Sequence, residues 1–84
     1  MPEVKLYTWS NCPFCVRAKD LLNRKGVAFT EIDLDGKDDE LQALRARTGL
    51  RTVPQIFVGE TLVGGFTDLA ALDARGELDR MLGR

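Results

Sequence analysis

The two cysteines of the chain are the residues best suited to covalent chemistry. Cys12 and Cys15 lie in the segment TWSNCPFCVRAK, residues 8–19, with Pro13 and Phe14 between them. The 84-residue chain has no other cysteine and no histidine. A pair at this spacing can help to bind a metal ion, close a structural disulfide or carry reversible thiol–disulfide exchange.

Neither a metal site nor a structural disulfide suits this pair. Tetrahedral zinc needs about four nitrogen or sulfur ligands, whereas the chain offers two cysteines and no histidine. A zinc site within one chain is therefore excluded, which leaves only a site shared in an oligomer. A disulfide that closes so short a loop removes little entropy from the unfolded chain. Dithiol redox chemistry is the interpretation that we favour.

Pro13 indicates that a helix begins at the pair, because proline suits the first helical turn. Apolar side chains recur after it at helical spacing, at Cys15, Ala18, Leu21 and Leu22. At the helix start, Cys12 would face free N–H groups and the positive end of the helix dipole, which favour the thiolate. We therefore expect Cys12 to act as the nucleophile and the less exposed Cys15 to resolve the mixed disulfide.

The rest of the chain indicates short strands that alternate with helices. We expect strands in residues 4–9 and 27–35, a hairpin of residues 55–58 and 61–63, and helices in residues 13–25, 36–49 and 66–83, the last broken at Gly76. Thr67 or Asp68 is expected to cap the last helical segment. A helical connection makes the first two strands parallel with a right-handed crossover. The pattern predicts a small mixed sheet with helices packed against it.

Length and charge limit the functional classes. We expect a single domain, residues 1–84, because the chain has little room for a second core. Lys and Arg number 12 against 13 Asp and Glu, without a long run of either sign, so a nucleic-acid partner is not expected. No signal peptide or span of about 20 apolar residues is evident, so we expect no membrane partner and a cytoplasmic location.

The motifs CPFC, TVP before a hairpin that ends in GG, and the following DL together resemble the glutaredoxin family of the dithiol type. The resemblance covers essentially the whole chain. It implies an α/β, thioredoxin-like fold with a four-stranded mixed sheet. It also implies reduction of protein disulfides and of glutathione mixed disulfides, with glutathione as cosubstrate and no tightly bound cofactor. The expected partners are glutathione and disulfide-bearing or glutathionylated proteins, and the chain is expected to act as a monomer.

The resemblance further implies roles for individual residues. Cys12 looks like the nucleophile and Cys15 like the resolving thiol, and Pro54 resembles the family's cis-proline. The glutathione-binding residues that the resemblance implies are Val53, Pro54, Gly65, Thr67 and Asp68. We add Trp9 and Phe14, which are expected beside the sulfur, and Thr52, which precedes Val53. Trp9 is a departure, because dithiol glutaredoxins commonly carry lysine three residues before the first cysteine.

Two other functions compete with glutathione-dependent reduction. In the first, two chains and two glutathione thiols hold an iron–sulfur cluster, but the rigid first turn at Pro13 leaves little room to reshape the loop around a cluster. In the second, a flavoprotein reductase of the thioredoxin type supplies the electrons. The pair Gly64 and Gly65, followed by Thr67 and Asp68, does not fit that function.

The expected helix start leads to a prediction for the reduced protein. We expect the pKa of the Cys12 thiol to lie below the value of about 8.5 for a free cysteine. The rate of alkylation and the thiolate absorbance, followed against pH, measure this pKa. A value at or above that of a free thiol would contradict stabilisation by the helix terminus.

Overall fold

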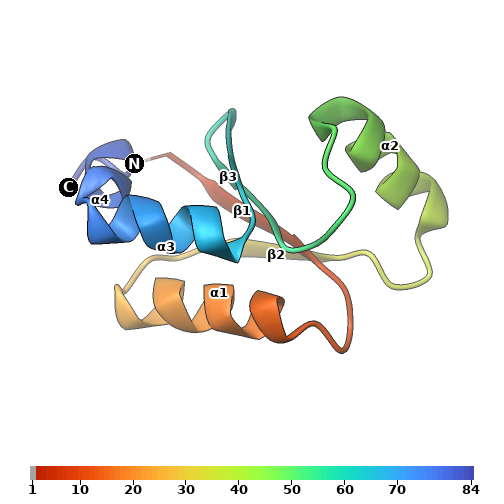
Figure 1. Ribbon diagram of the computed structural model, residues 1–84, viewed down its shortest axis with the longest axis horizontal. Helices are drawn as coiled ribbons and strands as arrows, with labels where there is room; N and C mark the ends of the chain where they lie inside the picture. Colours follow the sequence, from red (N-terminus) through yellow and green to blue (C-terminus); the bar gives the residue numbers. More distant parts are fainter. Residues whose placement is uncertain (1) are drawn as a thin grey trace.

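Residues 2–84 of the computed structural model form one four-stranded sheet that is covered by helices (Figure 1). The elements in chain order are β1 (Val4–Thr8), α1 (Pro13–Arg24), β2 (Thr30–Asp33), α2 (Asp38–Thr48), β3 (Gln55–Val58), β4 (Thr61–Gly64), α3 (Phe66–Ala74) and α4 (Glu77–Met81). The strand order is β2-β1-β3-β4, in which β1 and β2 are parallel and the other neighbours are antiparallel. The expected mixed sheet and the thioredoxin-like fold are confirmed.

The alternation along β1 separates two apolar clusters. The larger cluster joins the sheet to α1, α3 and α4 through fully or nearly fully buried residues, namely Val4, Leu6, Ala18, Leu21, Leu22, Val27, Ile56, Val58, Leu69, Leu78 and Leu82. The smaller cluster includes Leu44 of α2, with Tyr7 and Phe57 packed against it. The rings of Tyr7 and Phe57 meet edge to face with centroids 5.9 Å apart. Helix α2 therefore stabilises the sheet through a second, smaller core.

The ends of α1 and α2 follow from local sequence signals. Helix α1 has Pro13 in its first turn and buries the four apolar residues expected from their spacing. Helix α2 begins with three acidic residues and ends with arginines, which suits the helix dipole. It stops at Gly49, whose φ of 78° lies in the left-handed region that glycine adopts most easily.

The structure differs from the sequence prediction at the start of α3. Neither Thr67 nor Asp68 is the N-cap, because Gly65 takes that position with an extended backbone. Asp68 instead lies in the first turn, and its carboxylate accepts a hydrogen bond of 3.0 Å from the Gly65 N–H. The prediction was wrong because the Asp68 carboxylate does not precede the helix and accept from its first turn. It lies within that turn and accepts from the N–H of the N-cap residue three positions before it.

The second strand is shorter than residues 27–35, and the hairpin carries a register shift between Ile56 and Phe57. Within residues 2–84, strand β2 lies at one edge of the sheet and pairs with β1 alone. Among residues 2–84, every helix is too short or too polar to span a lipid bilayer.

Leu69 offers a direct test of the larger core. Leu69→Ala should lower the free energy of unfolding by about 2 to 5 kcal/mol, because it leaves a cavity where the leucine is fully buried. Urea denaturation followed by circular dichroism measures the change. Val16→Ala is the matched control, since that side chain is 53% exposed and its loss should change stability by less than about 0.5 kcal/mol. Equal effects of the two substitutions would contradict the packing described here.

Candidate active site

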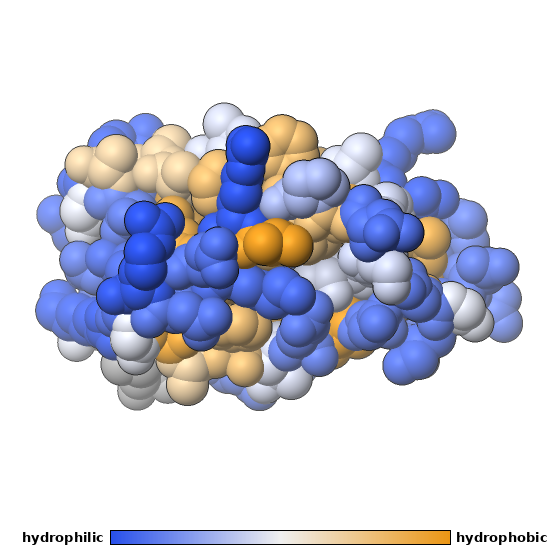
Figure 2. All heavy atoms as spheres, turned by 90° about the horizontal axis from the view of Figure 1, so that it is seen from below, coloured by the Kyte–Doolittle hydropathy of each residue, from blue (hydrophilic) through white to orange (hydrophobic). Residues whose placement is uncertain are grey.

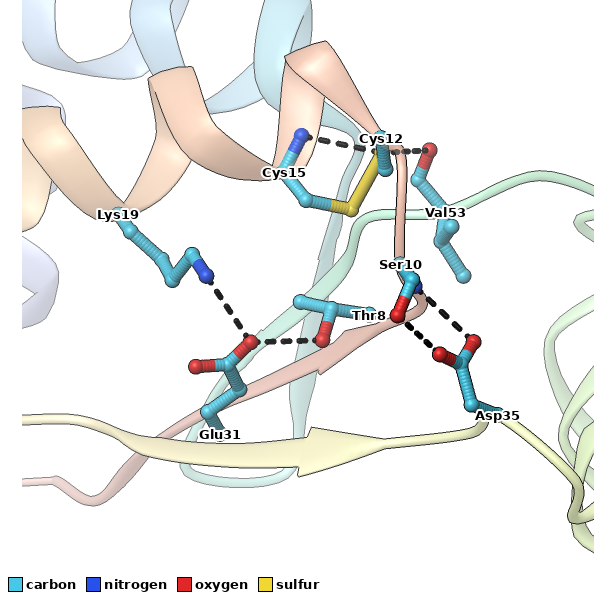
Figure 3. The surroundings of a disulfide bond; sticks show 8 residues. All are labelled: Thr8, Ser10, Cys12, Cys15, Lys19, Glu31, Asp35 and Val53. Carbon is cyan, nitrogen blue, oxygen red and sulfur yellow. Dashed lines mark hydrogen bonds and ion pairs between the residues drawn. A yellow bond between two sulfur atoms is a disulfide. The ribbon is translucent and has the colours of Figure 1, made fainter.

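The two cysteines form a disulfide where β1 leads into α1 (Figure 3). Their Cα atoms are 5.2 Å apart. Cys12 is the N-cap of α1, and its sulfur accepts a hydrogen bond of 3.1 Å from the Cys15 N–H. Cys12 is half-buried, whereas Cys15 is only 2% exposed. The more accessible sulfur therefore lies at the positive end of the helix, where an anion is stabilised.

The loop before Cys12 is attached to the segment that follows β2. Both the backbone N–H and the hydroxyl of Ser10 donate to the carboxylate of Asp35. The Ser10 hydroxyl is the main cause of the lowered pKa of Asp35, and the backbone N–H adds to it. The next residue, Asn11, has a φ of 58°, a left-handed conformation that asparagine tolerates better than most residues. These features turn the chain from the strand into the helix.

The backbone of Val53 lies against the Cys12 sulfur. The Val53 carbonyl oxygen is 3.6 Å from Cys12 Sγ, and the Val53–Pro54 peptide bond is cis, as the resemblance implied. Both residues are buried. This loop therefore forms one wall of the space beside the nucleophile expected from the sequence.

Gln55 ties that loop to α2, a role that the sequence analysis did not find. Its side chain is fully buried, accepts a hydrogen bond of 2.9 Å from the Thr48 hydroxyl and donates one of 3.2 Å to the Leu50 carbonyl. A buried amide needs such partners, since an unpaired one is costly. The one sequence signal that could have indicated this role is the polar Gln55 at the start of the otherwise apolar strand β3.

A groove of about 230 Å³ lies beside the disulfide. Its lining comes from the first turn of α1, from the loop before β3 and from the start of α3, namely Phe14, Leu50, Thr52, Val53, Pro54, Gly65, Phe66, Thr67 and Asp68. Seven of these nine were expected from the sequence, and Leu50 and Phe66 were not. Helices α1 and α3 lie side by side and run in the same direction (Figure 1), and residues at the start of each helix line this groove.

Gly64 allows the start of α3 to approach the groove. Its φ is 117°, and a Cβ atom at this position would collide with the Asp68 carboxylate. Glycine therefore leaves room for that carboxylate to reach the Gly65 N–H. A Cβ on Gly65 would lie 3.8 Å from the Pro54 carbonyl oxygen, which shows how closely the turn approaches the loop.

Trp9 is the one expected glutathione-binding residue that does not line the groove. It lies at a second hollow of about 210 Å³ on another side of the disulfide, where Cys12 and Cys15 also contribute. Its side chain is partly buried and packs against the smaller apolar cluster. Trp9 thus occupies a different wall of the site from the other expected residues.

A short row of polar groups lines this second hollow (Figure 3). The buried Thr8 hydroxyl donates to the Glu31 carboxylate over 2.8 Å, and Lys19 Nζ lies 3.1 Å from the same oxygen. The Thr8 hydroxyl is the main cause of the lowered pKa of Glu31, and Lys19 lowers this pKa further. Partial burial of the carboxylate acts in the opposite direction and raises it. The row joins β1, β2 and α1 close to the two cysteines.

Comparison with known proteins gives a consistent result. Residues 4–63 match the family model described as Glutaredoxin. The chain is 54% identical over 82 residues to a glutaredoxin of Pseudomonas aeruginosa, covering 98% of both chains. It is 49% identical over 82 residues to glutaredoxin 3 of Escherichia coli, covering 98% of this chain and 99% of the relative.

Solved structures agree with the sequence relatives. The solution structure of glutaredoxin from Brucella melitensis has a TM-score of 0.87 at 46% identity, covering 98% of this chain and 89% of the other. The crystal structure of a buckwheat glutaredoxin–glutathione complex has a TM-score of 0.92 at 30% identity, with coverage of 98% and 77%.

The Thr8–Glu31 hydrogen bond predicts a pH-dependent stability. A carboxyl whose pKa is lowered on folding stabilises the protein above its ordinary pKa of 4.5, and this stability is lost as the pH falls through the lower folded value. Thr8→Val removes this hydrogen bond and should therefore lower the free energy of unfolding by about 1 kcal/mol at neutral pH. The loss is no larger because the carboxylate is partly exposed, and it should be smaller at a pH below 4.5.

Urea denaturation over a series of pH values measures this difference. Thr30→Val is the control, since Thr30 is exposed and lies next to Glu31 in the edge strand β2. A loss for Thr8→Val that stays constant across the acid range would contradict the assignment to Glu31.

Proposed function

Because the chain belongs to the glutaredoxin family, it is a glutathione-dependent thiol–disulfide oxidoreductase, and we propose that Cys12 is its nucleophile and that the groove beside Cys12 receives glutathione. The position of the Cys12 sulfur supports this proposal most directly. That sulfur caps α1, accepts the Cys15 N–H and faces the Val53 carbonyl at the groove wall. A sulfur in this position is stabilised as a thiolate and stays accessible.

Reduction of a glutathione mixed disulfide needs only Cys12. The Cys12 thiolate attacks the glutathione sulfur, the disulfide of the substrate breaks, and the substrate thiol leaves with the electron pair and takes up a proton. Cys12 is then joined to glutathione. The thiolate of a second glutathione attacks the sulfur of the bound one, which releases oxidised glutathione and restores the Cys12 thiolate.

Reduction of a protein disulfide uses both cysteines. Cys12 attacks one sulfur of the substrate and forms a mixed disulfide with it, and the other sulfur leaves as a thiol. Cys15, after loss of its proton, attacks the Cys12 sulfur and displaces the second substrate thiol. The product on the enzyme is the Cys12–Cys15 disulfide present in the structure. Two glutathione molecules then reduce this disulfide and leave as oxidised glutathione.

We assign the ends of glutathione to different walls of the groove. The Val53 backbone would pair with the extended peptide as in strand addition. Gly65, Thr67 and the N–H groups at the start of α3 would bind the γ-glutamyl carboxylate, while Asp68 pairs with its amine. Phe14, Thr52 and Pro54 would contact the remaining atoms. Glutathione is thus a cosubstrate, and we propose no tightly bound cofactor.

The alternative function, a dimer that binds an iron–sulfur cluster, is not favoured. The paired cysteines and the relatives named glutaredoxin support the oxidoreductase instead. We propose that the chain acts as a monomer on disulfide-bearing and glutathionylated proteins. We also propose a cytoplasmic location, because a reducing glutathione pool is needed to regenerate the thiols.

Serine substitutions separate the roles of the two cysteines. Cys12→Ser should lower the reduction of glutathionylated 2-mercaptoethanol by at least about 1,000-fold, because a hydroxyl does not replace the thiolate. Cys15→Ser should retain that activity within about tenfold, since glutathione resolves the Cys12 adduct directly. Oxidation of NADPH, coupled through glutathione reductase, measures both rates.

The same two variants are also measured on a protein disulfide. Both should be strongly impaired in its reduction, because that reaction uses both cysteines. If Cys15→Ser lost the reduction of the small mixed disulfide as completely as Cys12→Ser, the single-cysteine route would be wrong.

A further inference from the structure

Helix α1 exposes apolar surface next to the cysteines. Phe14 is 50% exposed and Val16 is 53% exposed, and they flank Cys15 in the chain. Figure 2 shows the molecule from the side on which α1 lies, where orange side chains stand among mostly blue ones. Single exposed apolar residues are ordinary, so the surroundings of each decide whether it forms part of a larger surface.

Phe14 continues into a second aromatic ring. It stacks on Phe66 with centroids 6.3 Å apart and an angle of 29° between the planes. Phe14 lies in the first turn of α1 and Phe66 is the first residue of α3, and both rings line the groove. Phe66 is also partly buried against the larger core, which holds it in place. We call these two rings the aromatic ledge.

An unpaired positive charge lies over this ledge. The guanidinium carbon of Arg17 is 5.2 Å from the centre of the Phe14 ring. Within residues 2–84, no carboxylate forms an ion pair with Arg17. Lys25, at the other end of α1, instead contacts both Asp73 and Asp79. Arg17 therefore remains free to pair with a carboxylate on another molecule.

We propose that the aromatic ledge and Arg17 bind the polypeptide of the substrate next to its reacting cysteine, and that they favour an aromatic or large aliphatic side chain followed by a carboxylate. This inference rests on the proposed function and adds a substrate preference to it. The occupant is the polypeptide next to the reacting cysteine of a glutathionylated or disulfide-bearing protein. It would contact the two rings at the α1 side of the groove, while glutathione lies against Val53, Thr67 and Asp68.

The chemistry of the reaction brings that polypeptide to the ledge. A substrate must place its disulfide beside Cys12, so the residues next to its cysteine pass over the start of α1. An extended chain advances about 3.3 Å per residue, and the ledge begins two residues beyond Cys12 in the same helical turn. Residues one and two positions from the substrate cysteine are therefore within reach of Phe14 and Arg17. An apolar side chain on the rings and a carboxylate at the guanidinium complement this surface in shape and charge.

Three glutathionylated pentapeptides, blocked at both ends, test the preference. Their sequences are Glu-Phe-Cys-Phe-Glu, Lys-Phe-Cys-Phe-Lys and Glu-Ala-Cys-Ala-Glu, which are symmetric so that the direction of binding does not matter. The value of kcat/KM for each is measured with the native protein, with Arg17→Glu and with Arg24→Glu. Arg24 is an exposed residue at the far end of the same helix, so both variants carry the same net charge.

The comparison of two peptides within one enzyme cancels any effect of a substitution on the Cys12 thiolate. We expect the native protein and Arg24→Glu to prefer the Glu-Phe peptide over the Lys-Phe peptide by about threefold, and Arg17→Glu to reverse this preference. The Glu-Phe peptide should exceed the Glu-Ala peptide by about fivefold in the native protein.

Two results would each overturn the inference. One is a charge preference that changes equally in Arg17→Glu and Arg24→Glu, which would reflect net charge alone. The other is equal kcat/KM for the Phe and Ala peptides, which would mean that the ledge does not touch the substrate. Glutathionylated 2-mercaptoethanol, which has no polypeptide, separates this outcome from failure of the proposed function, because the native protein must still reduce it.

Discussion

The site depends on one hydrogen bond at a helix terminus. The Cys15 N–H points at the Cys12 sulfur because Cys12 is the N-cap of α1. This geometry does two things at once. It places unpaired backbone donors and the positive end of the dipole at the accessible sulfur, and it holds the second sulfur one turn away, where a disulfide can close. The left-handed Asn11 and the Ser10–Asp35 contacts turn the chain so that the helix begins here.

The groove exists because three segments distant in the chain meet at that terminus. The loop before β3 is held by the buried amide of Gln55, which bonds to Thr48 and to the Leu50 carbonyl. The start of α3 is shaped by Gly64 and by the Asp68 carboxylate that accepts the Gly65 N–H. Within residues 2–84, the polar contacts of the Cys12 sulfur come instead from the Cys15 N–H and the Val53 carbonyl. Gln55, Gly64 and Asp68 set the positions of the backbone groups that we propose bind glutathione, so their expected effect on function is through geometry.

The surroundings of the disulfide differ from side to side. On the groove side lie the Val53 carbonyl and the stacked rings of Phe14 and Phe66. On the side of the second hollow lie Trp9 and the row from Thr8 through Glu31 to Lys19. On our proposal glutathione occupies only part of the first side, against Val53 and the start of α3. A protein substrate is larger and also contacts the two rings and Arg17, which is where a preference between substrates can arise.

Local pattern alone determined the dithiol at a helix start, the buried stripe of α1, the parallel pair of strands and the hairpin around Gly59. Each of these depends on spacing within a few residues or on a general rule of chain connection. Tertiary packing decided that Phe66 stacks on Phe14, that Gln55 holds the groove loop and that Trp9 lies at the other hollow. These contacts join residues from different elements, whose relative placement is set by how whole faces pack together and not by the sequence near either partner.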